Sequence, residues 1–528
     1  MTTIEKGCVL VGVSEYGEFS SLIPLCKSIE SRFGLHPVFV FTAGYGLWRD
    51  HGQLVELENW SWARLGSKSA YSFRYPLDEK SKAGYFRVYD HPWGDRGRTP
   101  GMFDGITLQV LKLAVSAGYV MRRVAHRWQS ASASLPIGAK RHWDAQLKHA
   151  RRLFKQLQPR LVLSGQDYIL SVTSILAKVA EESGVKTVVV PYSMPPTTRE
   201  LIESFAYGGQ NRLRGVELLL APRLNPKLLN HRRGGIYARV NLIDAIHAER
   251  LGLTPPEPWL PNSGRGIVFV PSKQAYDYYA KAGIPEAQLR LTGANWSDHF
   301  VRSAATRPER KQKLLDRVRA MLSGQGARRA AMADALNASK RLVIVSWPPN
   351  QWPRRALGCL TYSDLCQQFI NSLSQIQSGG LASVVVSLHP TVNDQDILDR
   401  LEKAGVYVLR SSLIRYVDCA DVFMSTVSST SFWALQCGIP TINFDGYLYG
   451  YTEFDQAGAI TVRTPQDAYE ACEQLFENPA YMEEVMARIR DRAAYFTSED
   501  GGCMDRIMNE MEALIAPPPS GKKSRWAL

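Results

Sequence analysis

The stretch ASVVVSLHP, residues 382–390, decides the fold class of this chain. Three consecutive valines stand in it without polar alternation, and the run ends at His389 and Pro390. A strand that is covered on both faces shows no such alternation, which is typical of parallel sheets in α/β proteins. Proline helps to stop the strand, because its nitrogen has no hydrogen for the next ladder bond. The stretch therefore predicts a buried parallel strand whose carboxyl end presents a histidine.

Short apolar runs of this kind recur along the chain and alternate with helical patterns. In the second half each of them ends in small or polar residues: RLVIVSWPPNQ, ASVVVSLHP, AGVYVLRSS, DVFMSTVSS, IPTINFD and AITVRT. The first half begins with GCVLVGVS, a helical pattern and HPVFVFTAG, and it continues with similar runs up to AQLRLTG. Strands that alternate with helices imply a parallel sheet with helices on both faces. The order predicts two doubly wound, Rossmann-like α/β domains that face a central cleft.

Composition divides the 528 residues further. The stretch RPERKQKLLDRVRAMLSGQGARR is strongly basic and helical in period, and we interpret it as the connection between the domains. The C-terminal PPPSGKKSRWAL is a proline-led basic segment of the kind that stays disordered. The expected organisation is an N-terminal α/β domain over 1–300, a basic helical connection over 301–340, a C-terminal α/β domain over 341–490, a closing helix over 491–515 and a basic disordered tail over 516–528.

The net charge of +13 predicts attraction to anionic partners. Nucleotides and an anionic membrane face are the two alternatives, and no nucleic-acid partner is expected because no zinc-finger or RRM-type pattern is present. The chain shows neither a secretory leader nor an apolar run of about 18 residues. None of its eight cysteines forms a C-x-x-C pair. We therefore expect a cytoplasmic protein, with peripheral contact to the inner face of the cell membrane as one interpretation of the charge.

Three loops after strands of the second half carry side chains suited to bind an anion. SWPPNQWPRR offers Asn350, Gln351 and Arg354, and LHPT offers His389 and Pro390. The third loop, in STVSSTSFWALQCGIP, offers five hydroxyls within six residues just before a helix: Ser425, Thr426, Ser428, Ser429 and Thr430. One hydroxyl is enough for a helix cap, so this density predicts a phosphate site at the start of the helix. A plain cap by one of the two adjacent serines is the alternative.

The order of these motifs resembles the C-terminal domain of GT-B glycosyltransferases: HP after one strand, then a serine pair after a later strand, a helix and GIP. More narrowly, it is similar to bacterial sialyl-, polysialyl- and Kdo-transferases of surface-glycan synthesis, which use CMP-activated acidic sugars. QPRLVLSGQD and LRLTGANWSD resemble strands of the N-terminal domain in such enzymes. The resemblance implies a GT-B-like fold in which His389 with Pro390, and Ser428 with Ser429, engage the nucleotide phosphate.

The activity that this resemblance implies is a metal-independent, inverting transfer of a nonulosonic or ulosonic acid, such as a sialic acid or Kdo. The donor would be a CMP-linked sugar bound by residues 341–490, and no other cofactor is expected. The acceptor, a glycan, lipid-linked glycan or glycoprotein, would bind to residues 1–300. One departure concerns Trp433, which stands where many GT-B enzymes have a ribose-binding glutamate. UDP- and GDP-sugars are therefore less expected as donors, and Gln436 is an alternative partner for the ribose.

The catalytic base is expected in the N-terminal half, because an inverting transfer needs a group that takes the proton of the acceptor hydroxyl. Asp104 in GMFDGITLQV is the first candidate, since related sialyltransferases use an acidic residue before a glycine. Asp167 in SGQDY, at a strand end, is the second. A helix cap and a polar strand terminator are the respective alternatives. Glu15, Glu18 and His91 are further candidates on the acceptor side.

A D-x-D pattern at Asp394 and Asp396 offers a metal site in principle, but helix capping and the helix dipole explain both residues. No metal is expected. Two other classes of protein remain open. One is a sugar-nucleotide 2-epimerase of GT-B-like fold, which typically carries a carboxylate pair near the serines that the residues after Ser429 lack. The other is a non-catalytic scaffold that binds a polyanion through its basic surface.

Overall fold

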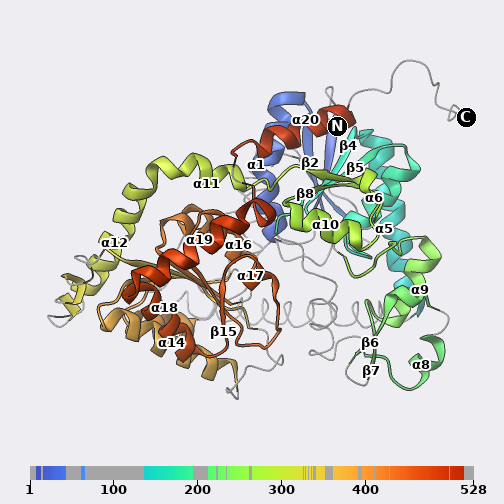
Figure 1. The fold of residues 1–528 in the computed structure, drawn as a ribbon. Helices are drawn as coiled ribbons and strands as arrows, with labels where there is room; N and C mark the ends of the chain where they lie inside the picture. The colour runs from blue at the N-terminus through green and yellow to red at the C-terminus, as the bar shows by residue number, and fades with distance from the viewer. Residues whose placement is uncertain are drawn as a thin grey trace, which may run out of the picture.

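Two parallel sheets form the framework of the protein (Figure 1). The computed structural model describes residues 7–13, 16–42, 61–65, 136–193, 212–221, 224–232, 235–260, 264–324, 340–350, 361–389, 395–409, 412–426, 428–498 and 500–515, with a few positions between 326 and 336. All pairings within these two sheets are parallel. In the described part of the chain, no helix is long and apolar enough to cross a bilayer.

The first sheet has seven strands in the order β3-β2-β1-β4-β5-β8-β9. The strands are β1 (Cys8–Val13), β2 (His36–Thr42), β3 (Ser61–Leu65), β4 (Leu161–Ser164), β5 (Lys186–Val189), β8 (Ile267–Val270) and β9 (Leu289–Leu291). The helices beside them are α1 (Tyr16–Phe33), α5 (Pro136–Leu157), α6 (Val172–Glu182), α9 (Leu242–Leu251) and α10 (Lys273–Lys281).

Strand β1 shows why this sheet is buried on both faces. Cys8 and Leu10 belong to a core with α5, α6 and α9, whereas Val9 and Val11 belong to a core with α1 and the C-terminal helix α20 (Cys503–Ile515). Successive side chains of a strand point to opposite faces, so a strand between two helical layers must be apolar throughout. Figure 1 shows α20, from the far end of the chain, beside α1.

The second sheet has six strands in the order β12-β11-β10-β13-β14-β15. The strands are β10 (Leu342–Ser346), β11 (Ser383–Ser387), β12 (Tyr407–Val408), β13 (Val422–Ser425), β14 (Thr441–Phe444) and β15 (Ile460–Val462). The helices beside them are α12 (Arg307–Ser323), α14 (Tyr362–Ser378), α15 (Gln395–Lys403), α16 (Thr430–Gln436), α17 (Glu453–Gln456), α18 (Pro465–Glu477) and α19 (Pro479–Phe496).

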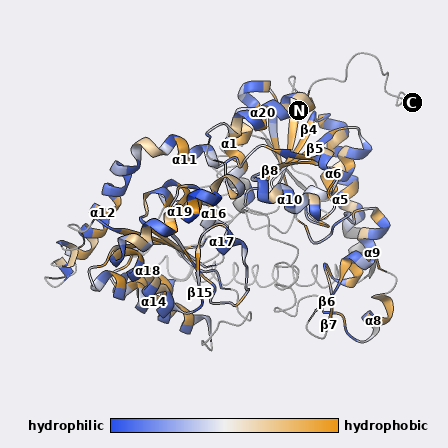
Figure 2. Ribbon diagram, viewed as in Figure 1, coloured by the Kyte–Doolittle hydropathy of each residue, from blue (hydrophilic) through white to orange (hydrophobic). Residues whose placement is uncertain are grey.

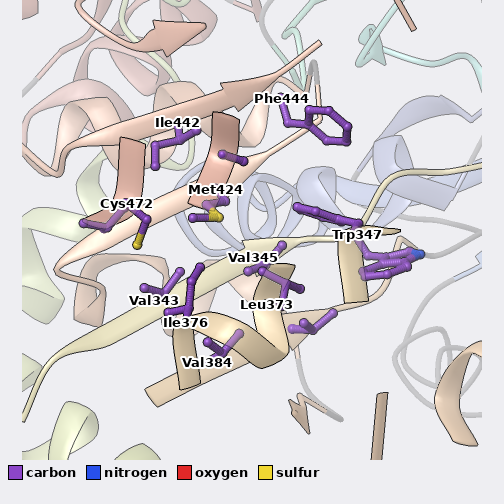
Figure 3. Packing of buried hydrophobic residues seen from close by; sticks show 14 of the residues in the cluster. Val343, Val345, Trp347, Leu373, Ile376, Val384, Met424, Ile442, Phe444 and Cys472 are labelled. Carbon is purple, nitrogen blue, oxygen red and sulfur yellow. The ribbon is translucent and has the colours of Figure 1, made fainter. Parts of the chain in front are cut away.

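One face of the second sheet packs against α14 and α18. Figure 3 shows Val345 of β10 and Met424 of β13 in the same cluster as Leu373 of α14 and Cys472 of α18. The opposite face packs against α12 and α16, so the basic helix expected as a connection contributes buried leucines to the core of the second sheet. Figure 2 shows the resulting pattern, with apolar strands inside and helices that are hydrophilic on their outer sides.

A buried polar joint connects the two sheets. The chain passes from β9 into α11 (Ser297–Ser303), and there the Ser297 hydroxyl donates to Gln436 Oε1 of α16 at 3.0 Å. The Gln436 amide nitrogen donates to the carbonyl oxygens of Ser297 at 3.3 Å and Ser498 at 2.8 Å. One residue further on, the buried Asp298 accepts the backbone N–H groups of Cys503 and Met504, at 2.9 and 2.8 Å. Asp298 thereby caps α20 from a different helix.

The expected fold class is confirmed: both halves are doubly wound parallel α/β units. The sequence patterns missed β3 and also a small lobe made of α8 (Val216–Leu220) and the antiparallel hairpin of β6 (Leu229–Arg232) and β7 (Gly235–Ala238). β3 reads SWARL and β6 reads LNHR, and neither is an apolar run of the kind that the other strands show. The expected tail, residues 516–528, lies outside the described residues.

Replacing Asp298 with asparagine should weaken the attachment of α20. Asparagine keeps one acceptor oxygen and turns an N–H₂ group toward a backbone donor, so one N–H group loses its partner in a buried site. We expect the free energy of unfolding to fall by about 1.5–3 kcal/mol, measured by chemical denaturation. Asp500→Asn is the matched control, because Asp500 lies before the same helix with its side chain 61% exposed and pairs with Arg506. Its loss should stay below about 1 kcal/mol, and equal losses would contradict the capping role of Asp298.

Candidate functional site

Polar residues end three neighbouring strands of the second sheet in register, and a polar residue also stands one position before the end of the next strand, β14. Ser346 of β10 lies opposite Ser387 of β11 and Ser425 of β13, and Ser425 lies opposite Asn443 of β14. The strands are parallel, so the loops that follow them leave from the same edge of the sheet, where ligands of open α/β sheets bind. This donor edge, as we call the ends of β10, β11, β13 and β14 with their following residues, brings together the three loops that the sequence singled out.

The loop after β10 is fastened by aromatic side chains. Trp347 is buried, and its ring lies 5.5 Å from that of Phe369 in the core of the sheet. The Tyr362 hydroxyl donates to the carbonyl oxygen of Pro348 at 2.7 Å, and the Tyr447 hydroxyl donates to that of Pro349 at 2.8 Å. Both proline carbonyls are therefore held in place. The anchored segment leads directly to Asn350, which is exposed.

The hydroxyls after β13 do not form one equivalent set. Ser425 is buried, and its Oγ bonds to Oγ of the buried Ser431. Ser428 and Thr430 are half-buried and bond to each other, with 3.0 Å between their hydroxyl oxygens. Ser428 Oγ also accepts the backbone N–H of Thr430 at 3.3 Å, which is a turn contact before the helix because Ser428 precedes the N-cap residue, Ser429. Ser429 precedes α16 without capping it through its side chain.

Thr426 differs from its neighbours. Its side chain is 4% exposed, and no described group lies within hydrogen-bond distance of its Oγ1. A buried hydroxyl without a partner costs about 1–3 kcal/mol of stability. Native proteins rarely leave such groups unsatisfied, and another described hydroxyl of this kind is that of Ser164 at the end of β4. Thr426 follows the strand end Ser425 directly, so this hydroxyl lies at the donor edge.

His389 lies two residues beyond the end of β11 and is half-buried. On the other side of the edge, Asp445 was not among the predicted site residues; it lies just beyond β14 and is 2% exposed. Its Oδ1 accepts the N–H of Tyr449 at 2.9 Å and its Oδ2 that of Gly450 at 2.8 Å. Burial raises the pKa of Asp445, and these hydrogen bonds act against that rise. Asp445 thus shapes the loop, and an acidic residue just after a strand was the available signal.

The side chains of Gln436 and Trp433, both in α16, lie at the joint between the sheets. Both hydrogen-bonding groups of Gln436 are used by Ser297 and Ser498, so this residue is not a free partner for a ribose. The ring of Trp433 lies 6.4 Å from both Trp296 and Phe300, in the core that joins α11 to the second sheet. The position discussed above for a ribose-binding glutamate therefore holds a tryptophan that packs into this core.

The first sheet presents carboxylates at the end of β4. Asp167 is fully buried in the loop after this strand. Glu18 of α1 is also fully buried, and its Oε1 accepts the backbone N–H groups of Gly165 at 2.7 Å and Gln166 at 3.1 Å. A β-carbon on Gly165 would come within 2.8 Å of Glu18 Cγ, so the close approach requires glycine. Glu18 thus fixes the loop that carries Asp167.

Several predicted site residues lie outside the described residues: Asp104, Glu15, His91, Gln351, Arg354 and Pro390. Asp394 of the D-x-D pattern also lies outside them. Asp396 is placed in the first turn of α15, where it pairs with Arg400 at 3.1 Å. That ion pair accounts for Asp396 within its own helix, and metal independence stays a prediction.

Comparison with known proteins gives the fold and no closer relation. No protein-family model matches the sequence, and no curated protein resembles it significantly. The calicheamicin glycosyltransferase CalG4 matches with a TM-score of 0.51 and 13% identity, over 97% of this chain and 100% of the other. UDP-GlcNAc 2-epimerase from Neisseria meningitidis, bound to UDP-GlcNAc, has a TM-score of 0.47 and 10% identity, over 96% and 99%. At such identity the likeness to CalG4 shows the fold, which is GT-B-like.

Replacing Thr426 with valine removes an unsatisfied hydroxyl and keeps the branched shape. Without ligand, the free energy of unfolding should therefore stay equal or rise, by about 3 kcal/mol at most, in chemical denaturation. The matched control is Thr441→Val on the adjacent strand, because the Thr441 hydroxyl is also buried but donates to the carbonyl oxygen of Ile439 at 2.9 Å. There the same substitution should cost about 1 kcal/mol. A clear loss of stability in Thr426→Val would mean that its hydroxyl already has a partner.

Proposed function

We propose that the protein is a metal-independent glycosyltransferase that moves a sugar from a nucleotide donor to a glycan or glycoconjugate. The donor that we favour is a CMP-activated acidic sugar of the nonulosonic or ulosonic type. The observation that carries the proposal is the donor edge, where an unpartnered buried hydroxyl, that of Thr426, lies at the end of a parallel strand beside further hydroxyl-bearing residues. The GT-B-like fold is compatible with this function and does not by itself decide it.

The chemistry of a leaving phosphate fits these residues. Negative charge grows on the phosphate as the bond to the sugar breaks, and donors fixed beforehand at that place lower the barrier. In our proposal Ser428 and Ser429 donate their hydroxyl hydrogens to the phosphate oxygens. Thr426 does the same once the residues that cover it open, because its side chain is 4% exposed. His389 donates from its imidazole, and its neighbour Pro390 belongs to the same proposed set. Asn350, Gln351, Arg354, Ser425 and Thr430 complete the proposed donor-binding set.

The preference for CMP rests on what α16 does with its side chains. Residues 428–440 contain no acidic residue, so this segment offers no carboxylate to a ribose. Trp433 and Gln436 contact the joint between the sheets. A UDP- or GDP-sugar enzyme that binds the ribose through a glutamate at position 433 would lack that contact in this chain. We therefore rank CMP-linked donors first.

For the base we keep Asp104 in first place and Asp167 in second. A general base must reach the acceptor hydroxyl directly or through one water. Asp167 is fully buried, so the loop that carries it would have to open toward an acceptor. In this proposal Glu18 is a positioning residue for that loop, while Glu15 and His91 remain candidates on the acceptor side. The proposed place of action is the cytoplasm, with the protein peripheral to the inner face of the cell membrane.

A panel of nucleotides tests the donor class. CMP should raise the melting midpoint of the protein in the presence of EDTA, and UMP and GMP should raise it less, because a ligand that binds the folded state alone stabilises it. At about a hundred times its Kd, such a ligand adds about 2.7 kcal/mol to the free energy of unfolding. Ser428→Ala with Ser429→Ala should weaken CMP binding about tenfold or more.

Three outcomes would redirect the proposal. Stabilisation by UMP alone would favour a UDP-sugar enzyme and would bring back the 2-epimerase. A response that needs Mg²⁺ or Mn²⁺ would return attention to Asp394 and Asp396. No response to any nucleotide would leave the polyanion-binding scaffold as the better interpretation. Thr441→Val should respond to CMP as the wild type does, since its hydroxyl is bonded within the protein.

Substitution of the two aspartates separates base from structural residue. Asp104→Asn keeps shape and an acceptor oxygen but removes basicity, so turnover should fall about 10²-fold or more while the melting midpoint holds. A helix cap predicts almost no change, since asparagine caps as well as aspartate. Asp167→Asn is the parallel test. Full loss of turnover in Asp167→Asn with an active Asp104→Asn would assign the base to the loop after β4.

A further inference from the structure

The lobe formed by α8 and the β6–β7 hairpin, residues 212–239, lies at the periphery of the first domain (Figure 1). It has a small core of its own, in which Leu213, Ala221 and Ala238 are buried. The Leu213 N–H donates to the carbonyl oxygen of Ile236 at 2.9 Å, and Arg212 pairs with Tyr237 through an isolated bridge. These contacts hold α8 on the hairpin, so the side chains on its outer side have a defined place.

Two leucines of α8 face outward. Leu218 is 42% exposed and Leu219 is 76% exposed, the largest exposed fraction among the large hydrophobic residues described. Figure 2 shows α8 as a hydrophobic element at the edge of the molecule. Leu213 and Ala221, which flank α8, are each 4% exposed and pack in the small core of the lobe. Exposed apolar side chains gathered at a projecting tip, and not scattered over the surface, indicate a contact site.

The lobe that carries these leucines is rich in Lys and Arg. Residues 212–239 contain seven Lys or Arg residues and one acidic residue, Glu217. Arg214 and Lys227 are exposed. Glu217 Oε2 accepts the backbone N–H of Arg214 at 2.9 Å, so the carboxylate of the lobe is engaged at the start of α8. Arg239 packs over the rings of Tyr168 and Trp259 and so does not belong to this exposed charge. Exposed cations on the same lobe as an apolar tip are the pattern that binds an anionic lipid surface, with the apolar side chains among the acyl chains and the cations at the headgroups.

We propose that this lobe docks the protein on an anionic membrane, with Leu218 and Leu219 inserted below the headgroups. The charge decides against an apolar protein partner or a second copy of the chain, since the exposed Arg212, Arg214 and Lys227 would have to be desolvated or face their counterparts. Two exposed leucines likewise have no role on a nucleic acid. The inference names the surface for the peripheral location proposed above, and it does not depend on the glycosyl transfer or on the donor nucleotide.

The test is sedimentation of the full-length protein with vesicles, without any sugar nucleotide. Vesicles of phosphatidylcholine with about one third phosphatidylglycerol should bind the wild type, and binding should weaken with salt. Leu218→Ser with Leu219→Ser should weaken binding about tenfold or more, because the apolar contact is lost. Arg214→Gln should weaken it about fivefold, and only on the anionic vesicles. The melting midpoint of each variant checks that the fold is kept.

Leu291→Ser is the matched control, since Leu291 of β9 is 48% exposed and lies outside the lobe. It should bind vesicles as the wild type does. Equal binding by the Leu218/Leu219 variant overturns the proposal. Loss of binding in Trp526→Ala, with the lobe variant unaffected, would assign the contact to the C-terminal tail. A wild-type dimer that the lobe variant turns into a monomer, without any binding to vesicles, would assign the surface to a second copy. Each outcome is measured without turnover, so failure of the proposed transfer would leave the result standing.

Discussion

The buried hydrogen bonds around Gln436 set the position of the donor edge. This amide is satisfied by Ser297 from α11 and by Ser498 from the segment before α20, which are the two places where the chain passes between the sheets. A fully satisfied buried polar network fixes one arrangement, because any other arrangement leaves a polar group without a partner. Helix α16 is only seven residues long, so its Gln436 end is fixed at this joint while its first residues adjoin Thr426. The geometry of the hydroxyls is therefore coupled to the joint between the domains.

Much of the fold could be predicted because parallel sheets impose a simple pattern. Strands between two helical layers are apolar throughout, and they exchange apolar for polar residues where they leave the sheet. The serines at the ends of β10, β11 and β13 follow from that rule, and their common register follows from the parallel pairing. Residue type and order along the chain were enough to expect them at one edge. The missed hairpin has no such pattern, since its strands cover a small core at the periphery.

The roles of single hydroxyls could not be predicted, because they depend on partners that are distant in space or on burial. Ser425 and Thr426 are adjacent and chemically alike, yet one is paired with Ser431 and the other has no partner among the described residues. Gln436 lies at the centre of the joint because it bonds to Ser297, more than a hundred residues away in the sequence, and a local sequence pattern does not reveal such a contact. Glu18 accepts hydrogen bonds from the loop after β4 across a similar separation in sequence, and Gly165 was the one residue that indicated the close approach of this loop to Glu18.

The ends of the two sheets differ in their balance of carboxylates and hydroxyls, and this difference bears on the proposed reaction. The first sheet has two buried carboxylates, Glu18 and Asp167, beside the end of β4, where Ser164 carries a hydroxyl. The second has hydroxyls at the ends of β10, β11 and β13, and Asp445, a buried carboxylate at that edge, accepts two backbone N–H groups of its own loop. Carboxylates repel a phosphate and can take a proton, whereas hydroxyls bind a phosphate and are poor bases. The transfer that we propose needs both properties. In that proposal, a phosphate oxygen bound to Thr426 would give a partner to a buried hydroxyl that otherwise costs stability.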